Sequence, residues 1–234
     1  MNKYKILLLH GKQDVSKMSE YLRGRGHWVT VSDTKQYLDD LGRFDFVMSF
    51  FYRYILKADQ IDGAKHGVAN FHPSYLPFGR GANPNVWAII EGTVAGVTLH
   101  WIDSGVDTGP IIAQKQVGIS FLDTGQSVHG RTLHECYNLF YSTWPKIEAS
   151  LGGVDVDDPG FTWRGKPQDD VGLTRRHAKR VRDFEAIKNV GAYTQVINIL
   201  RALTFLPYNN AYFLDDNGRK VYLRVEAYYD DEPG

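Results

Sequence analysis

Short apolar runs alternate with helix-like stretches along the first two thirds of the chain. The apolar runs predict strands at 5–9, 27–32, 45–51, 67–72, 96–102 and 111–119. The intervening and following stretches predict helices at 14–25, 34–41, 57–65, 84–92 and 123–151. Strands that alternate with helices favour right-handed crossovers, so the pattern predicts an α/β fold with a Rossmann-like, mainly parallel, doubly wound sheet.

Capping and breaking residues mark several expected helix ends. Asn83 can cap a helix, Pro84 suits its first position, and Gly92 can end it. A cap at Asp123-Thr124 begins the longest predicted helix, in which Pro145 is expected to cause a break or a kink.

The character of the sequence changes at Gly152-Gly153. Gly, Pro, Asp and Arg become frequent, and residues 152–189 predict a crossing linker. Helical periodicity returns at 190–203, and the turn Asp215-Asp216-Asn217-Gly218 predicts a β-hairpin, since Asn-Gly accepts positive φ at both turn positions. We therefore expect a catalytic domain over 1–151, a linker over 152–189, and a small helix and β-hairpin over 190–234.

Composition narrows the class of protein. The 234 residues are 43% hydrophobic, and 27 basic residues balance 27 acidic ones, so no net field attracts nucleic acid. No apolar run reaches the length of about 18 residues that a membrane span needs. A single cysteine, Cys136, excludes an internal disulfide and fits a reducing compartment. We expect a cytoplasmic enzyme without a membrane or nucleic-acid partner.

Two common kinds of site are missing from the sequence. The first predicted strand leads into His10-Gly11-Lys12-Gln13, which lacks the G-x-G-x-x-G pattern of a dinucleotide-binding turn. His129 and His134 are five residues apart, so they do not share a helix face, and no Cys or carboxylate set completes a metal site. We expect no metal.

Three polar residues at expected strand ends carry the candidate chemistry. Asn70 and His72 alternate with apolar residues, so both point to one side of their strand, and Asp107 lies in the loop after another strand. If an amine attacks a bound carbonyl, an amide stabilises the oxyanion, an imidazole takes the proton, and a carboxylate orients the imidazole or relays the proton.

Structural roles for the same residues remain open at this point. A single histidine at a strand end is often only a hydrogen-bonded structural residue, Asn70 can satisfy backbone groups, and Asp107 can form an Asx turn. His100, on a strand among apolar neighbours, is expected to be structural.

Longer motifs around these residues resemble one family. Its motifs match Asn70-Phe71-His72-Pro73-Ser74-Tyr75-Leu76-Pro77, Arg80-Gly81, Gly96-Val97-Thr98 and Asp107-Thr108-Gly109-Pro110-Ile111-Ile112. Over about residues 5–150 the chain thus resembles the folate-dependent formyltransferases, which include glycinamide ribonucleotide, methionyl-tRNA and nucleotide-sugar enzymes.

The resemblance implies specific roles. Asn70, His72 and Asp107 match the family's catalytic trio, and the implied formyl donor is N10-formyltetrahydrofolate. The segment Tyr54-Ile55-Leu56 and the loop that begins at Ile102 and Asp103 match parts of the pterin pocket, and Leu76-Pro77 matches a cis proline.

The tail favours one acceptor among three. A glycinamide ribonucleotide enzyme would be expected to end near the long helix, and a tRNA-directed enzyme to carry a larger basic domain. Residues 197–204, Pro207 and the hairpin are instead similar to nucleotide-sugar N-formyltransferases, and imply a substrate of the dTDP-linked amino-dideoxy sugar class. Formylation of another small amine, such as glycinamide ribonucleotide, and a non-catalytic folate- or nucleotide-binding module stay open.

The resemblance also implies substrate contacts. Arg80 would face the pyrophosphate, Asn83 would place the sugar, and Tyr222 would stack on the base, although a solvated arginine, a helix cap and an edge-strand tyrosine explain them as well. Because an isolated hairpin is marginal in water, we expect a homodimer through the C-terminal region, whose hairpin is rich in aromatic residues, namely Tyr212, Phe213, Tyr222, Tyr228 and Tyr229.

Overall fold

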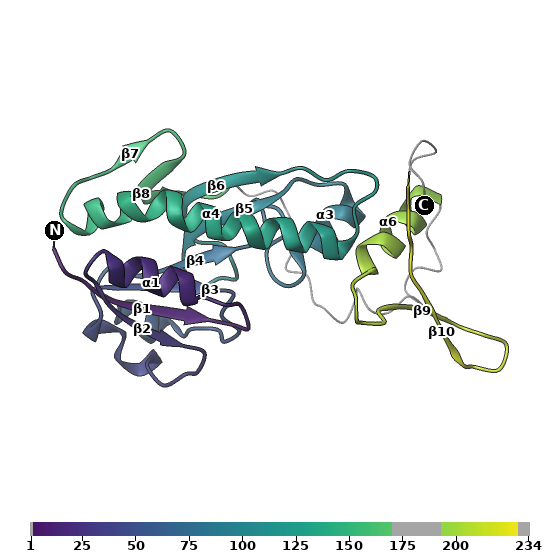
Figure 1. Cartoon of the computed structure of the whole chain (residues 1–234), viewed down its shortest axis with the longest axis horizontal. Coiled ribbons are helices and arrows are strands. Elements are labelled where there is room, and N and C mark those ends of the chain that lie inside the picture. Colours follow the sequence, from purple (N-terminus) through teal and green to yellow (C-terminus); the bar gives the residue numbers. More distant parts are fainter. Residues whose placement is uncertain (1, 170–192, 229–234) are drawn as a thin grey trace. The chain divides into compact units, whose positions relative to one another are not determined.

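The computed structural model describes residues 2–169 and 193–228, and the chain divides into two compact units (Figure 1). The first unit comprises Met1–His72, Val97–Lys115 and Glu135–Asp170. The second comprises Pro73–Gly96, Gln116–His134 and Val171–Gly234. No helix among the described residues combines the length and the apolar character that crossing a membrane requires.

A mixed sheet of eight strands carries the fold, in the order β2-β1-β3-β4-β5-β6-β8-β7. Its strands are β1 (Lys5–His10), β2 (Trp28–Ser32), β3 (Phe46–Phe50), β4 (Val68–His72), β5 (Ala95–Trp101), β6 (Ile111–Val117), β7 (Asp157–Asp158) and β8 (Phe161–Lys166). The pairs β1–β2, β1–β3 and β3–β4 are parallel, whereas β4–β5, β6–β8 and β7–β8 are antiparallel. The predicted α/β class and its parallel core are confirmed.

The central strands of the first unit bury both faces. On one face Leu7, Leu9, Val47 and Val68 pack with residues of the 38–44 segment. On the other face aromatic residues of β3 and β4 meet α4 (Gly125–Leu151), as in the Phe71–Phe140 and Phe46–Trp144 pairs. Strands buried on both faces read as continuous apolar runs, which is why the sequence pattern located them.

Helix α4 supplies the largest fully buried side chain among the described residues, that of Trp144. Trp144 and Phe140 are fully buried, and so is the single cysteine, Cys136, whose thiol has a pKa raised by burial. The helix continues through Pro145, so the expected break is wrong. Burial of the residues on either side outweighs the one backbone hydrogen bond that the proline cannot make.

Three other predicted segments differ in form. Residues 34–41 give a 3₁₀ helix, η1, shifted to Leu38–Arg43, and 57–65 gives only the short helix α2 (Ala58–Asp62). Helices α1 (Ser16–Gly24) and α3 (Pro84–Glu91) lie within the predicted ranges. The expected helix cap at Asn83 is absent, because its side chain makes no capping hydrogen bond and its backbone is left-handed, with φ of 56°.

The first part of the expected linker forms strands instead. Phe161 is buried in β8, and the indole of Trp101 donates to the Trp163 carbonyl oxygen over 2.9 Å. Two isolated aromatic residues thus anchor this segment to the sheet, a role that its Gly- and Asp-rich composition concealed. The remainder of the linker, 170–189, lies outside the described residues.

The second unit has its own small core around α3 and α6 (Tyr193–Leu203). The start predicted for α6, 190–192, lies outside the described residues. The expected hairpin is present as β9 (Ala211–Leu214) and β10 (Lys220–Leu223). Only Gly218 of its turn has positive φ, and Asp215 bonds through its backbone to both Gly218 and Arg219, so the expectation for Asn217 is wrong. The turn is a three-residue loop closed by a glycine bulge.

Candidate active site

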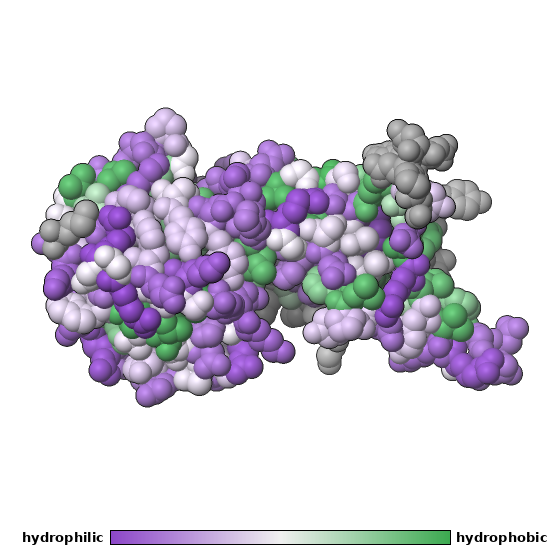
Figure 2. All heavy atoms as spheres, in the orientation of Figure 1, coloured by the Kyte–Doolittle hydropathy of each residue, from purple (hydrophilic) through white to green (hydrophobic). Residues whose placement is uncertain are grey.

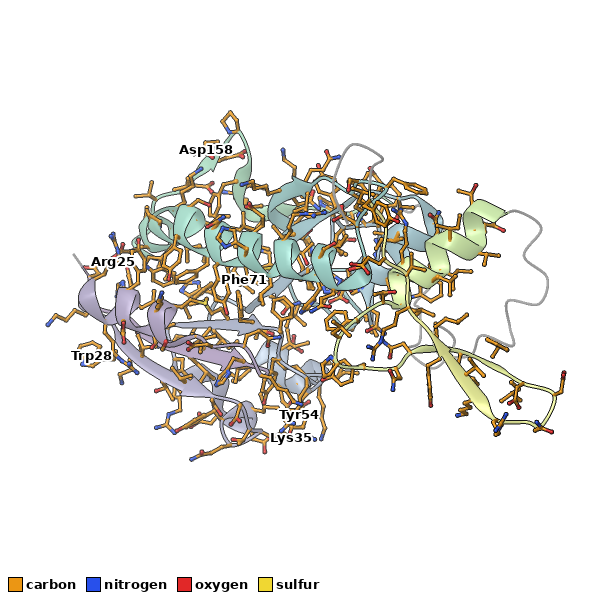
Figure 3. The ribbon with its side chains drawn as sticks, turned by 45° about the vertical axis from the view of Figure 1, so that its right-hand side comes forward. Arg25, Trp28, Lys35, Tyr54, Phe71 and Asp158 are labelled. Carbon is orange, nitrogen blue, oxygen red and sulfur yellow. The ribbon has the colours of Figure 1, made fainter. Side chains whose placement is uncertain are left out.

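Strand β4 presents Asn70 and His72 on the face away from α4. Phe71, between them, packs on Phe140 (Figure 3 labels Phe71). Pro73 follows directly and has no N–H with which to extend a ladder, so His72 stands at the carboxyl end of the strand. His72 is only 7% exposed. Ligands of open α/β sheets bind at this edge.

Asp107 reaches the same place from the loop after β5. One carboxylate oxygen lies 3.6 Å from His72 Nε2 and the other 3.6 Å from His100 Nε2. The backbone of Asp107 is left-handed, with φ of 54°, a conformation uncommon outside glycine. Gln168 holds this loop, since its Nε2 donates to the carbonyl oxygens of Asp107 and Gly109 over 2.9 and 2.7 Å.

Glycine is required two residues after the carboxylate. A Cβ atom at Gly109 would lie 1.8 Å from the Trp101 carbonyl oxygen. The close approach of these two backbone segments sets the path of the loop, so the glycine of the Asp107-Thr108-Gly109 motif helps to place the Asp107 side chain.

A chain of hydrogen bonds fixes the amide of Asn70. Ser49 Oγ donates to Asn70 Oδ1 over 2.7 Å, and Asn70 Nδ2 lies 3.1 Å from His100 Nε2. His100 Nδ1 lies 2.7 Å from the Trp101 carbonyl oxygen, which can only accept. His100 therefore carries its proton on Nδ1 and accepts from Asn70 through Nε2, which leaves Asp107 as a partner for His72.

Sequence reasoning missed this part of the site. Ser49 passed unnoticed in an apolar strand, and His100 was expected to be merely structural. His100 reaches Asn70 because β5 pairs antiparallel with β4 in a register that places the two residues opposite each other. The sequence alone does not reveal this register.

The residues expected around the pterin lie in the first unit, on two segments. Leu56 is buried in the core that contains Val68, and Ile102 packs against the same core. Asp103 accepts hydrogen bonds from Gly105 N and Thr108 Oγ1. The centre of the Tyr54 ring lies 4.9 Å from Lys35 Nζ (both residues are labelled in Figure 3), and Ile55 is 74% exposed.

The residues expected to contact the sugar nucleotide lie in the second unit. Asn83 is exposed, and its amide makes no hydrogen bond to any described residue. Arg80 is partly buried in the loop before it. Tyr222, on β10, is 46% exposed and stacks edge-on with Tyr212 at 5.9 Å.

The loop that contains Arg80 also carries the expected cis proline, since the Leu76-Pro77 bond is cis. Within residues 2–169 and 193–228, no three His, Cys, Asp or Glu side chains come together in a way that would hold a metal ion.

Comparison with protein families finds two matches. A family described as formyl transferase matches residues 27–143, and a family described as N-formyltransferase dimerization C-terminal domain matches residues 187–228. Both lie where the sequence motifs predicted them.

Comparison with individual proteins also finds formyltransferases. A dTDP-4-amino-4,6-dideoxyglucose formyltransferase from Mycobacterium bovis is 34% identical over 188 residues, which make up 78% of this chain and 73% of the relative. A crystal structure from Mycobacterium tuberculosis aligns with a TM-score of 0.79 at 28% identity, over 98% of this chain and 100% of that one. A formyltransferase from Anoxybacillus kamchatkensis, in complex with UDP-4,6-dideoxy-4-formamido-L-AltNAc and tetrahydrofolate, aligns with a TM-score of 0.67 at 31% identity, over 83% and 97% of the two chains.

Proposed function

We propose that this chain, which belongs to the formyl transferase family, transfers a formyl group from N10-formyltetrahydrofolate to the amino group of a nucleotide-linked amino-dideoxy sugar. The relatives support the donor and the acceptor class, since one is a dTDP-amino sugar formyltransferase and another was crystallised with tetrahydrofolate and a UDP-linked formamido sugar. We take the dTDP-linked sugar as the first candidate.

The observation that carries the assignment is the meeting of three groups in the first unit. His72 Nε2 lies 3.6 Å from Asp107 Oδ2, and Asn70 lies on the same strand face, two residues earlier. The His72–Asp107 distance exceeds that of a direct hydrogen bond, and such contacts commonly tighten when substrate binds.

In the proposed reaction the sugar amine attacks the formyl carbon. A bond forms between the two, an oxyanion develops on the formyl oxygen, and the amine nitrogen becomes positively charged. Asn70 Nδ2 carries two hydrogens, of which one is directed to His100, while the second has no acceptor among the described residues. That second N–H is the donor for the oxyanion.

His72 takes the proton that the amine releases. Asp107 stabilises the imidazolium that results and fixes the ring's tautomer. The bond between the formyl carbon and N10 then breaks, and the proton passes to N10. The products are tetrahydrofolate and a formamido sugar, so atoms and charge balance without a metal ion.

The remaining roles follow the same proposal. Tyr54, Ile55, Leu56, Ile102 and Asp103 line the pterin site, while Arg80, Asn83 and Tyr222 contact the pyrophosphate, sugar and base. The unpaired amide of Asn83 supports its part, because a helix cap does not use it.

The test is a transfer assay with N10-formyltetrahydrofolate and a panel of amines. We expect dTDP-4-amino-4,6-dideoxyglucose to gain one formyl group by mass spectrometry, with glycinamide ribonucleotide unchanged. Formylation of glycinamide ribonucleotide alone would contradict the sugar assignment. Activity that a chelator abolishes and zinc restores would contradict the metal-free mechanism.

A further inference from the structure

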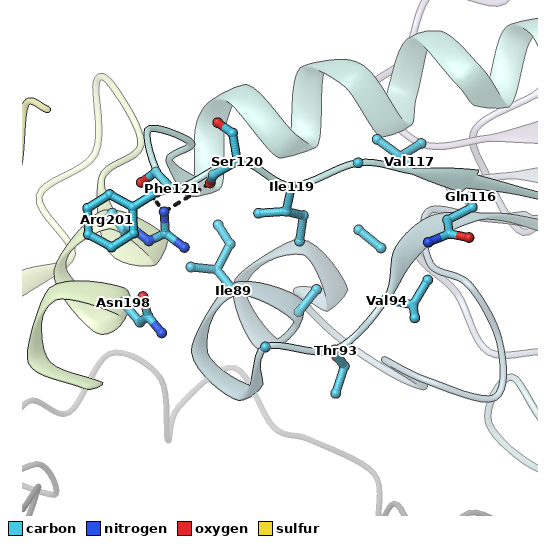
Figure 4. Close-up of a pocket in the computed structure, with 14 residues that line it drawn as sticks. Ile89, Thr93, Val94, Gln116, Val117, Ile119, Ser120, Phe121, Asn198 and Arg201 are labelled. Carbon is cyan, nitrogen blue, oxygen red and sulfur yellow. Dashed lines mark hydrogen bonds between the residues drawn. The ribbon is translucent and has the colours of Figure 1, made fainter. Parts of the chain in front are cut away.

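A second site candidate lies entirely within the second unit. A cavity of about 410 Å³ is lined by the end of α3, the loop that leads from it into β5, the end of β6 with the loop that follows, and two residues of α6 (Figure 4). Much of its wall is apolar, formed by Ile89, Val94, Ala95, Val117, Ile119 and Phe121. Volumes of roughly 300–1,000 Å³ with a few convergent polar groups are typical of small-molecule sites.

Arg201 is a buried cation in this wall. It is 7% exposed, and its Nη1 donates to the carbonyl oxygens of Ser120, at 3.0 Å, and of Phe121. Its guanidinium also lies 4.9 Å from the centre of the Phe121 ring. Its Nε is buried and has no acceptor among the described residues. Two carbonyls therefore use only part of its donor capacity.

The charge of Arg201 has no carboxylate of its own in the described chain. Burial lowers the pKa of the guanidinium, although an arginine remains protonated at neutral pH, and Asp123 opposes the effect from a distance. Asp123 is already occupied, because Arg131 binds both its oxygens at 2.6 Å and Ser127 Oγ donates to it over 2.7 Å. A buried charge without a partner is costly, and an anion would remove that cost.

A neutral polar group stands beside the cation. Asn198 lies three residues before Arg201, on the same face of α6, and both line the cavity (Figure 4). The Asn198 amide makes no hydrogen bond to a described residue. Tying α6 to the loop before α4 explains the two carbonyl contacts of Arg201, but it explains neither the idle donors nor the open space beside them.

We propose that this cavity binds a small amphipathic anion, whose carboxylate or phosphate pairs with Arg201 and Asn198 while an apolar body lies against Ile89, Val94 and Ile119. This ligand is separate from the formyl donor and acceptor proposed above, and the inference does not depend on them.

Small probes test the proposal on the full-length protein. Benzoate carries a carboxylate on an apolar ring, and phenyl phosphate carries a phosphate on the same ring. Benzamide is the neutral counterpart of benzoate, and inorganic phosphate is an anion without the ring. We expect benzoate or phenyl phosphate, at about ten times its Kd by calorimetry, to raise Tm by about 3 °C. Benzamide and inorganic phosphate should leave Tm within 1 °C, the approximate scatter of the measurement. The stronger of the two anions identifies the ligand's charged group.

Asn198→Asp isolates the charge without removing Arg201. The new carboxylate can pair with Arg201 three residues along the helix, so the variant should remain folded and lose at least about tenfold in affinity for the anion. Gln195→Glu adds the same charge to an exposed position of α6 outside the cavity and should bind normally.

Three outcomes would overturn the proposal. The first is equal binding by Asn198→Asp and the native protein. The second is equal stabilisation by inorganic phosphate and phenyl phosphate, which means a bare anion site. The third is no binding of either aromatic anion, as when a second copy of the chain fills the cavity.

Discussion

At the scale of single residues, the amide of Asn70 is oriented by its neighbours. Ser49 occupies its oxygen and His100 one of its two hydrogens, so the direction of the other hydrogen is set before substrate arrives. Donors that are already oriented need no reorganisation during the reaction, which is the main source of electrostatic catalysis.

We therefore expect Ser49→Ala to lower kcat about fivefold to tenfold with little change in KM. The variant loses a hydrogen bond of about 1 kcal/mol that directs the amide, and the loss appears in the transition state. Steady-state kinetics measure the effect. Ser142→Ala is the control, since among the described residues the Ser142 hydroxyl bonds only to the Leu139 carbonyl oxygen of its own helix. A rise in KM at constant kcat would assign Ser49 to substrate binding instead.

The proposed trio predicts larger effects. His72→Ala and Asn70→Ala should each lower turnover at least about 10²-fold, through loss of the base and of the oxyanion donor, while circular dichroism shows the native fold. Both side chains stand at a strand end, where truncation disturbs chemistry more than packing. Near-normal turnover in either folded variant would make that residue structural.

The sequence predicted the residues whose spacing along the chain is informative. Asn70 and His72 share a face because strand side chains alternate, and Asp107 sits in a recognisable motif. Ser49, His100 and Gln168 belong to the site through strand pairing and a distant return of the chain, which no local pattern encodes.

At the scale of secondary-structure elements, the start of α4 depends on one carboxylate. Asp123 is 5% exposed, and burial opposes its charge. Hydrogen bonds from Arg131, Ser120 N and Ser127 outweigh burial and hold the pKa of the carboxyl well below its usual range. Thr124 caps the helix by accepting from Ser127 N, as its position in the sequence predicted.

Folding lowers this pKa, so the stability gained from Asp123 is fully present above the unfolded value of about 3.9 and declines as pH falls below it. We expect Asp123→Asn to lower the free energy of unfolding by about 1–3 kcal/mol at neutral pH, as measured by urea titration. The difference from the native protein should shrink between about pH 5 and pH 3.

Asp216→Asn provides the control for this measurement, because Asp216 is exposed in the hairpin turn. A difference between native protein and Asp123→Asn that stays constant down to pH 3 would show that shape, not charge, explains the cost.

The sequence predicts correctly whether a segment forms a strand or a helix where the segment is buried along its whole length. Strands β1, β3 and β4 are buried on both faces, and the sequence pattern predicts each of them to within a residue or two of its observed ends. The segments 34–41 and 157–166 are short and polar, so tertiary contacts decided between helix, 3₁₀ turn and strand. In the second case Phe161 and Trp163 make those contacts.

At the scale of the whole molecule, the C-terminal segment has too much exposed apolar surface for an isolated hairpin. Tyr208, Phe213, Leu214 and Tyr222 are each more than 40% exposed, and hydrophobic side chains reach the surface near β9 and β10 (Figure 2). Together with the match to a dimerization domain, this surface supports a homodimer.

We expect the full-length protein to sediment as a dimer at micromolar concentration. Removal of all residues after 185 should give monomers or aggregates that bind the sugar nucleotide poorly and folate normally. Phe213→Glu should weaken the dimer at least about tenfold, because a charge enters an apolar contact. Trp28→Glu, at a site 58% exposed in the first unit, should not. A monomeric full-length protein would refute the dimer.

The burial of Cys136 has a practical consequence for labelling. Its thiol stays protonated and enclosed, so the folded protein should take up no maleimide, whereas the protein unfolded in urea should take up one per chain. The native cysteine therefore does not have to be removed before a new cysteine is introduced for labelling. A cysteine introduced at Ile55, which is 74% exposed beside Tyr54, will accept a single dye without further engineering. If Tyr54 and Ile55 line the pterin site as proposed, the fluorescence of that dye should change when folate binds.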